Sequence, residues 1–142
     1  MERANILTNK RYIAINIILF GVLYLSVTFN KEFIRPVYGH FPIIGIITGS
    51  FPNFMAAYII SLFPIAPILA RNIGIKKARL IIYFVSIFVF IILTLEELNP
   101  FVDASKTYDI YDILASGLGS FVAILTFEVF IKKVIKRKKI AL

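Results

Sequence analysis

Five of the eight acidic residues of this chain lie within residues 96–112, between two long apolar stretches. Carboxylates accept hydrogen bonds from hydroxyls and amines, and a lysine ammonium can donate to a phosphate or a carboxylate. At a membrane face such groups are costly to desolvate, and they commonly mark a functional site. The acidic residues of this segment, among which Lys106 is the only base, are Glu96, Glu97, Asp103, Asp109 and Asp112.

The last two of these aspartates begin a regular pattern. Asp109 and Asp112 are followed by Ser116 and Gly119 at spacings of three, four and three residues, which places all four on one face of a helix. Carboxylates in the first turn also interact favourably with the helix dipole. Two interpretations stay open. The aspartates can simply cap a helix with a packing seam, or they can converge with Glu96 and Lys106 on an outward-facing polar pocket.

Small residues extend along the same stretch at intervals of four, as Ala115, Gly119 and Ala123. Such a pattern lets membrane helices approach closely, against a second helix of the chain or against a partner. An earlier apolar stretch has a similar small, polar face, formed by Asn53, Ala57 and Ser61. Asn53, the first of these residues, can contribute to the site.

The composition indicates a multi-pass membrane protein of one domain, residues 1–142. The chain is 59% apolar and 17% charged, with a mean hydropathy of +0.86, whereas soluble domains are about 45–50% apolar and about 25% charged. It has no cysteine and one histidine, His40, so we expect no metal centre and no cofactor. The net charge of +8 resides in short segments between apolar stretches, which does not favour nucleic acid as a partner.

Four membrane spans are predicted, at residues 12–30, 53–70, 80–97 and 109–131. The first also resembles a signal peptide, but its apolar run is longer than a signal core, and we expect an uncleaved anchor. Thirteen lysines and arginines lie on one side of these spans and three on the other. This bias predicts cytoplasmic termini (N-in/C-in) and an outward-facing acidic loop. The apolar piece at residues 41–48 is too short to span and is predicted to be re-entrant or interfacial.

The acidic segment resembles the VanZ-like family of small bacterial membrane proteins. That family has Glu-x-x-Gln, then Arg-x-x-Asp-x-x-Asp, then Asn-x-x-Gly entering the last helix. This chain has Glu-x-x-Asn at 96–99, Lys-x-x-Asp-x-x-Asp at 106–112 and Ser-x-x-Gly at 116–119. The departures are Asn99, Lys106 and Ser116, and lysine cannot reproduce the bidentate contact of an arginine. The resemblance covers residues 45–125.

The resemblance implies an all-helical protein of the bacterial cytoplasmic membrane, with its acidic motif near the outer surface. It also implies a link to low-level resistance to the glycopeptide teicoplanin, although most members have no assigned biochemistry. The candidate ligand-binding residues are Glu96, Asn99, Lys106, Asp109, Asp112, Ser116 and Asn53.

Three functions fit these features. The first is a non-enzymatic envelope protein that binds an amphiphile or lipid-linked headgroup, with membrane lipids, a lipid-linked envelope precursor or a glycopeptide as partners. The second is a carboxylate-dependent membrane enzyme acting on lipid-linked substrates, which the lack of a Ser/His or Cys/His arrangement makes less favoured. The third is a small transporter or helper subunit, forming a homo-oligomer or joining a partner membrane protein through the small-residue face.

Overall fold

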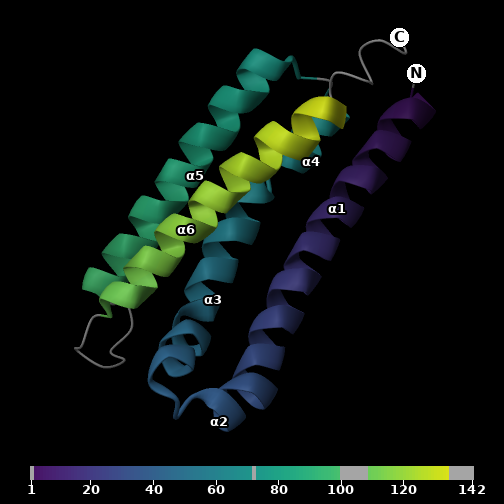
Figure 1. Cartoon of the computed structure of the whole chain (residues 1–142). Helices are drawn as coiled ribbons and strands as arrows, with labels where there is room; N and C mark the ends of the chain where they lie inside the picture. The colour runs from purple at the N-terminus through teal and green to yellow at the C-terminus, as the bar shows by residue number, and fades with distance from the viewer. Residues whose placement is uncertain (1, 72, 100–108, 135–142) are drawn as a thin grey trace.

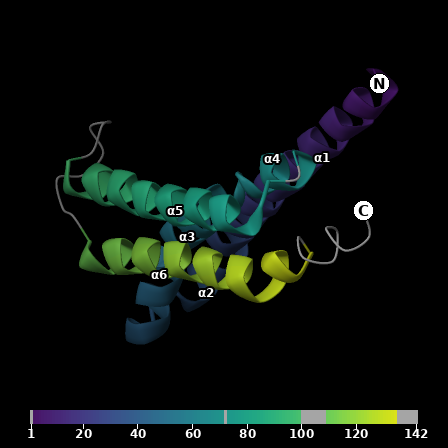
Figure 2. The same cartoon turned by 90° about the horizontal axis from the view of Figure 1, so that it is seen from above.

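The computed structural model describes residues 2–71, 73–99 and 109–134, and every element in these ranges is a helix. Four segments are long and apolar enough to cross a membrane: Ile13–Tyr38, Pro42–Ala70, Ile75–Leu98 and Ile110–Val134. The predicted fold class, an all-helical protein with four membrane-spanning helices, is confirmed at this level. Figures 1 and 2 show the helices as a tilted bundle in which the end of α5, the start of α6 and α2 lie at the same end.

The first span is α1 (Glu2–Phe29), which continues through the π-helical turn η1 (Asn30–Ile34) into α2 (Arg35–Tyr38). The next helix, α3 (Pro42–Leu62), starts after a tight turn. A Cβ on Gly45 would lie 2.4 Å from the carbonyl oxygen of Gly39, and one on Gly39 would lie equally close to that of Arg35. The turn can close this sharply because neither position carries a side chain.

Residues 41–48 therefore do not form a separate re-entrant piece. Pro42 occupies the first turn of α3, where its missing N–H is not needed, and the helix runs unbroken from there to Leu62. The apolar residues that follow Pro42 are the first turns of the second span. This span begins at residue 42 rather than at the predicted residue 53 because Pro52 is accommodated inside the helix.

Pro64 ends α3 at its C-terminus. Pro64 cannot donate a backbone hydrogen bond, and the chain passes through Phe63 and Pro64 into the short helix α4 (Ile65–Ala70). The N–H of Phe63 bonds to Ile60 O at 3.2 Å, a tightened last turn.

The remaining spans are α5 (Ile75–Leu98) and α6 (Ile110–Thr126), and α6 continues as the π-helical turn η2 (Phe127–Ile131). Helices α3, α5 and α6 pack against one another, while α1 lies along α3 and α4 (Figure 1). Only 6% of the most apolar window of the first span is buried, against 39% for Pro42–Ala70. The first span is therefore largely surrounded by lipid rather than by protein.

The buried side chains divide the bundle into two halves. We call the end that carries Glu96, Glu97, Asp109 and Asp112 the acidic end, and the end that carries Arg71, Lys76, Lys77, Arg79, Lys132 and Lys133 the basic end. The half toward the basic end contains the apolar core: Leu62, Ile65, Ile68, Ala78, Ile82, Ala123 and Phe127. Toward the acidic end the buried residues are mostly polar, with Thr48, Ser50, Ser86, Ser116 and Ser120 among them. The candidate site lies at the acidic end of this polar half.

Candidate functional site

Asp109 joins the end of α5 to the start of α6. Its Oδ1 accepts a hydrogen bond from the N–H of Tyr111 at 2.9 Å, which caps α6, and its own N–H donates to Glu97 Oε1 at 2.8 Å. An aspartate N-cap satisfies one of the free amides of the first helical turn. Through these two bonds, Asp109 caps α6 and Glu97 links the end of α5 to the start of α6. Asp109 is therefore a helix cap, the first of the two interpretations of this residue.

Asp112, in the first turn of α6, is arranged differently. Its Oδ1 is buried and has no hydrogen-bond partner within the described residues. Its backbone carbonyl accepts the hydroxyl of Ser116 at 2.9 Å, so that hydroxyl is turned to its own helix rather than to the carboxylate. A buried acceptor without a partner is costly. Asp112 therefore presents an acceptor that a donor from outside the helix would satisfy.

The other candidates are less closely associated with this carboxylate. Glu96 and Asn99 are exposed at the end of α5, and Asn53 is half-buried on α3. Within the described part of the chain, no hydrogen bond or ion pair joins any of these three to Asp109 or Asp112. Glu97, rather than Glu96, is the glutamate that reaches Asp109. Lys106 lies outside the described residues.

The small-residue face of α6 is covered by α3 of the same chain. A Cβ on Gly119 would lie 2.3 Å from Phe54 O and 3.0 Å from the Ala57 Cβ, so the two backbones touch at this point. Ala123 is fully buried and Ala115 is half-buried. Because α3 occupies this face, it does not provide the contact surface that a helper subunit or homo-oligomer was predicted to use.

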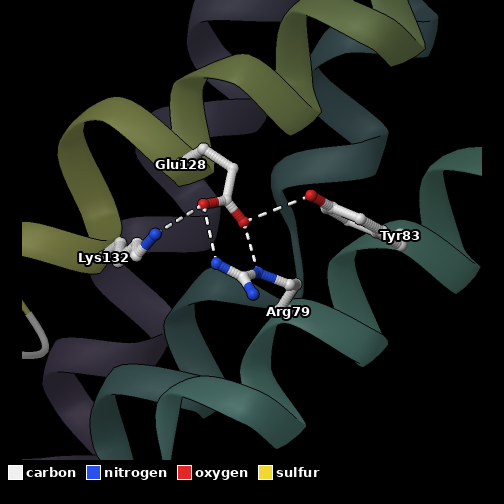
Figure 3. A network of polar contacts seen from close by, with 4 residues as sticks. All are labelled: Arg79, Tyr83, Glu128 and Lys132. Atoms are coloured by element: carbon white, nitrogen blue, oxygen red, sulfur yellow. Dashed lines mark hydrogen bonds and ion pairs between the residues drawn. The ribbon is translucent and has the colours of Figure 1, made fainter.

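A polar cluster that the sequence did not reveal lies at the basic end. The Arg79 guanidinium binds both carboxylate oxygens of Glu128, and the carboxylate also accepts the Tyr83 hydroxyl at 3.2 Å and the Lys132 ammonium at 3.0 Å (Figure 3). Glu128 and Lys132 are four residues apart, a spacing at which oppositely charged side chains meet on one helix. Arg79 and Tyr83 are likewise four residues apart on α5, but nothing in their spacing shows which helix they face.

The chemistry available at the acidic end is hydrogen-bond acceptance. Among the described residues, no group of three or more His, Cys, Asp or Glu side chains is placed to hold a metal ion. One oxygen of Glu97 and one of Asp109 accept backbone amides, and Asp112 Oδ1 is the buried carboxylate oxygen of the described residues that has no partner. An amine, a guanidinium or a hydroxyl is the complementary group.

No known protein family, curated protein or solved structure matches this chain. The resemblance of its acidic segment to the VanZ-like family therefore stays a prediction from the motif residues.

Proposed function

We propose that this chain is a VanZ-like protein of the bacterial cytoplasmic membrane whose outward-facing acidic end binds an amphiphile or a lipid-linked headgroup. The observation that supports the proposal is the buried Asp112 Oδ1, which has no hydrogen-bond partner within the described residues. An amine or hydroxyl of a ligand headgroup would supply the missing donor. Membrane lipids surround the site because the apolar faces of all four spans are exposed.

The orientation follows from charge. Arg71, Lys76 and Lys77 precede or begin α5, and Lys132 and Lys133 follow η2, so these bases lie at one end of the bundle. Short basic segments are retained on the cytoplasmic side of a membrane. The acidic end then faces outward, at the depth where a lipid-linked headgroup of the outer leaflet would lie.

Binding is favoured over catalysis by the surroundings of the carboxylates. The enzyme alternative relies on paired carboxylates, which act as acid and base when they lie close enough to push their pKa values apart. Within the described residues, Asp112 Oδ1 has no hydrogen-bond partner, and Glu97 contacts Asp109 only through the backbone N–H of that residue. A single open carboxylate can orient and hold a donor group without taking part in a proton relay.

The test is teicoplanin susceptibility of bacterial cells that express the chain, alongside an Asp112→Asn variant and a Glu32→Gln control. Both changes remove one carboxylate at nearly constant shape, but Glu32 is exposed on η1 and is not among the candidate binding residues. We expect the intact chain and the control to lower susceptibility equally and the Asp112 variant to lose the effect. Equal amounts of each protein in the membrane must be shown. If the intact chain leaves susceptibility unchanged, the glycopeptide link is wrong, and if the Asp112 variant keeps the effect, the assignment of the site is wrong.

A further inference from the structure

Three serines from three different helices carry buried hydroxyls without a partner. Ser61 on α3 and Ser86 on α5 are fully buried, and Ser120 on α6 is 5% exposed. None of the three hydroxyls has a hydrogen-bond partner within the described residues. Serine and threonine in membrane helices usually bond to the carbonyl four residues earlier, as Ser116 and Thr126 do here at 2.9 and 2.8 Å. The three serines do not use that local solution.

Helix register places the hydroxyls of Ser86 and Ser120 in one layer, with that of Ser61 beside its deeper edge. Helix α5 runs antiparallel to α6, with Phe90 against Gly117 and Arg79 against Glu128, so Ser86 lies opposite the turn that holds Ser120. Helix α3 runs parallel to α6 (Figure 1), with Ala57 against Gly119. Ser61 is therefore at the level of Ala123, about one turn or 5 Å deeper than Ser120 at 1.5 Å per residue.

Two more unpartnered groups lie between this layer and the acidic end. Thr94 Oγ1 is buried and has no partner within the described residues, and the same register puts Thr94 opposite the turn that holds Asp112. Asp112 Oδ1 is the other such group. The unpartnered atoms thus lead from the acidic end into the middle of the bundle. Beyond Ser86 and Ser120, Ile82, Ala123 and Phe127 belong to the apolar core, and Ser61 lies at the border of that core.

Unsatisfied polar groups are particularly costly inside a membrane, where no bulk water can reach them. Water held inside the protein would satisfy several of these hydroxyls at once, because one water molecule makes two to four hydrogen bonds. A dry interior would instead leave four hydroxyls and one carboxylate oxygen without partners among the described residues.

We propose that the polar half of the α3–α5–α6 interior is an internal hydrated site, open toward the acidic end and closed toward the basic end by the apolar core. The described residues that define it carry one negative charge, at Asp112, and no positive charge. It therefore accepts water and small cationic or hydroxyl-bearing groups and disfavours anions. This site goes beyond headgroup binding at the surface and does not depend on it, because water can occupy the interior whether or not a headgroup binds outside.

The chain has no cysteine, so single cysteines can be introduced without other changes. We would replace Ser86 and Ser120 by cysteine, one at a time, in the full chain in detergent micelles. Ile82→Cys is the matched control, because Ile82 is fully buried, lies one turn from Ser86 on α5 and belongs to the apolar core. Thr94→Cys is a second probe near the opening. Each thiol is reacted with two membrane-impermeant methanethiosulfonates, a trimethylammonium cation and a sulfonate anion.

We expect the cysteines at 86, 94 and 120 to react about tenfold faster than the cysteine at 82, because only a hydrated thiol ionises to the reactive thiolate. The ratio of the cation's reaction rate to the anion's should be larger at these cysteines than at a free thiol in solution. In the Asp112→Asn background this ratio should fall to the value for the free thiol. Equal rates at all four positions, or no reaction at 86 and 120, would overturn the proposal. Size-exclusion profiles and complete labelling after denaturation show that each variant is folded and carries its thiol.

The two results separate this site from the proposed function. Cysteine reactivity depends only on water and small reagents reaching the interior, whereas teicoplanin susceptibility depends on binding of a headgroup in cells. A hydrated interior with no change in susceptibility would leave the present inference standing and remove the glycopeptide link. A dry interior with lower susceptibility would confine binding to the surface of the acidic end.

Discussion

Arg79 and Glu128 form a bidentate ion pair that joins the second turn of α5 to η2. Arg79 Nε lies 2.5 Å from Glu128 Oε1, and Nη2 lies 3.0 Å from Oε2. Lys132 reaches the same carboxylate from the next turn of its own helix, and Tyr83 from the next turn of α5. The planar guanidinium matches the carboxylate in both distance and direction, which a lysine ammonium cannot do. This pair therefore fixes the register of α5 and α6 at the basic end.

Replacing Arg79 should weaken the bundle more than replacing Lys132. Both side chains are partly exposed, at 40% and 30%, so solvent screens both interactions. Arg79 nevertheless makes two charge-assisted bonds between helices, whereas Lys132 makes one within its own helix. We expect Arg79→Ala to lower the Tm in detergent by roughly twice as much as Lys132→Ala. Equal shifts would show that the second guanidinium bond adds nothing to stability.

Gly119→Ala should be strongly destabilising because the added methyl group meets backbone. Its Cβ would lie 2.3 Å from Phe54 O and 3.0 Å from Tyr58 N, and α3 and α6 would have to separate. Overpacking of this kind costs about 1–3 kcal/mol. Gly21→Ala on α1 is the control, since nothing lies within 4 Å of its Cβ position and alanine favours the helix by about 0.5–1 kcal/mol. Thermal unfolding in detergent should therefore move in opposite directions for the two variants.

The number and type of the spans could be predicted from the sequence because they depend on local composition. A run of apolar residues long enough to cross a bilayer has few alternatives to a helix. The ends of the second span could not be predicted, because Pro52 and Pro64 have the same local signature. The structure keeps Pro52 within α3 and ends the helix before Pro64, a difference that tertiary packing decides.

In the candidate site, too, the sequence predicts local features, whereas tertiary packing decides the surroundings of each side chain. The spacing of Asp109 and Asp112 predicted two carboxylates in the first turn of a helix, but not their different surroundings. Asp109 is exposed and caps the helix, while Asp112 has a buried, unpartnered oxygen. Which glutamate reaches Asp109 depends on how α5 is rotated about its axis. This rotation follows from packing against α3 and α6, and Glu96 and Glu97 are equivalent in sequence.

The attachment of the first span to the bundle should depend on Asn30. Its Nδ2 donates to Thr48 O at 2.7 Å, and Asn30 is buried although most of this span is not. Asn30→Leu leaves that carbonyl without its side-chain donor, and we expect a loss of about 1–3 kcal/mol in the free energy of unfolding. The control is Ser26→Ala, because the Ser26 hydroxyl bonds only within its own helix, to Leu23 O. Faster proteolysis at the connection between α2 and α3 should accompany the loss in the Asn30 variant alone.

The N-in/C-in orientation can be tested with single cysteines on intact cells. Tyr38 precedes α3 at the acidic end, and Lys77 lies in the first turn of α5 at the basic end; both are exposed. If the acidic end faces outward, an impermeant maleimide should label Tyr38→Cys in intact cells and Lys77→Cys only after the cells are opened. The reverse pattern would place the acidic end in the cytoplasm. The proposed binding of an outer-leaflet headgroup would then be wrong, while the hydrated interior would be unaffected.

Asp112→Asn should stabilise the protein when no ligand is present. The carboxylate places one oxygen in a buried position without a partner, and an uncharged amide is less costly to desolvate there, by about 1–3 kcal/mol. Against this, the helix dipole loses a favourable charge, which is worth about 0.3–1 kcal/mol. The first effect is larger, so we expect the Tm to rise slightly, by the equivalent of about 1 kcal/mol.

Asp109→Asn is the control, because asparagine caps a helix as well as aspartate does and should leave the Tm unchanged. A higher Tm for Asp112→Asn together with a lost effect on susceptibility is the pattern expected of a residue kept for function at a cost in stability. A lower Tm would instead assign Asp112 to the support of the helix.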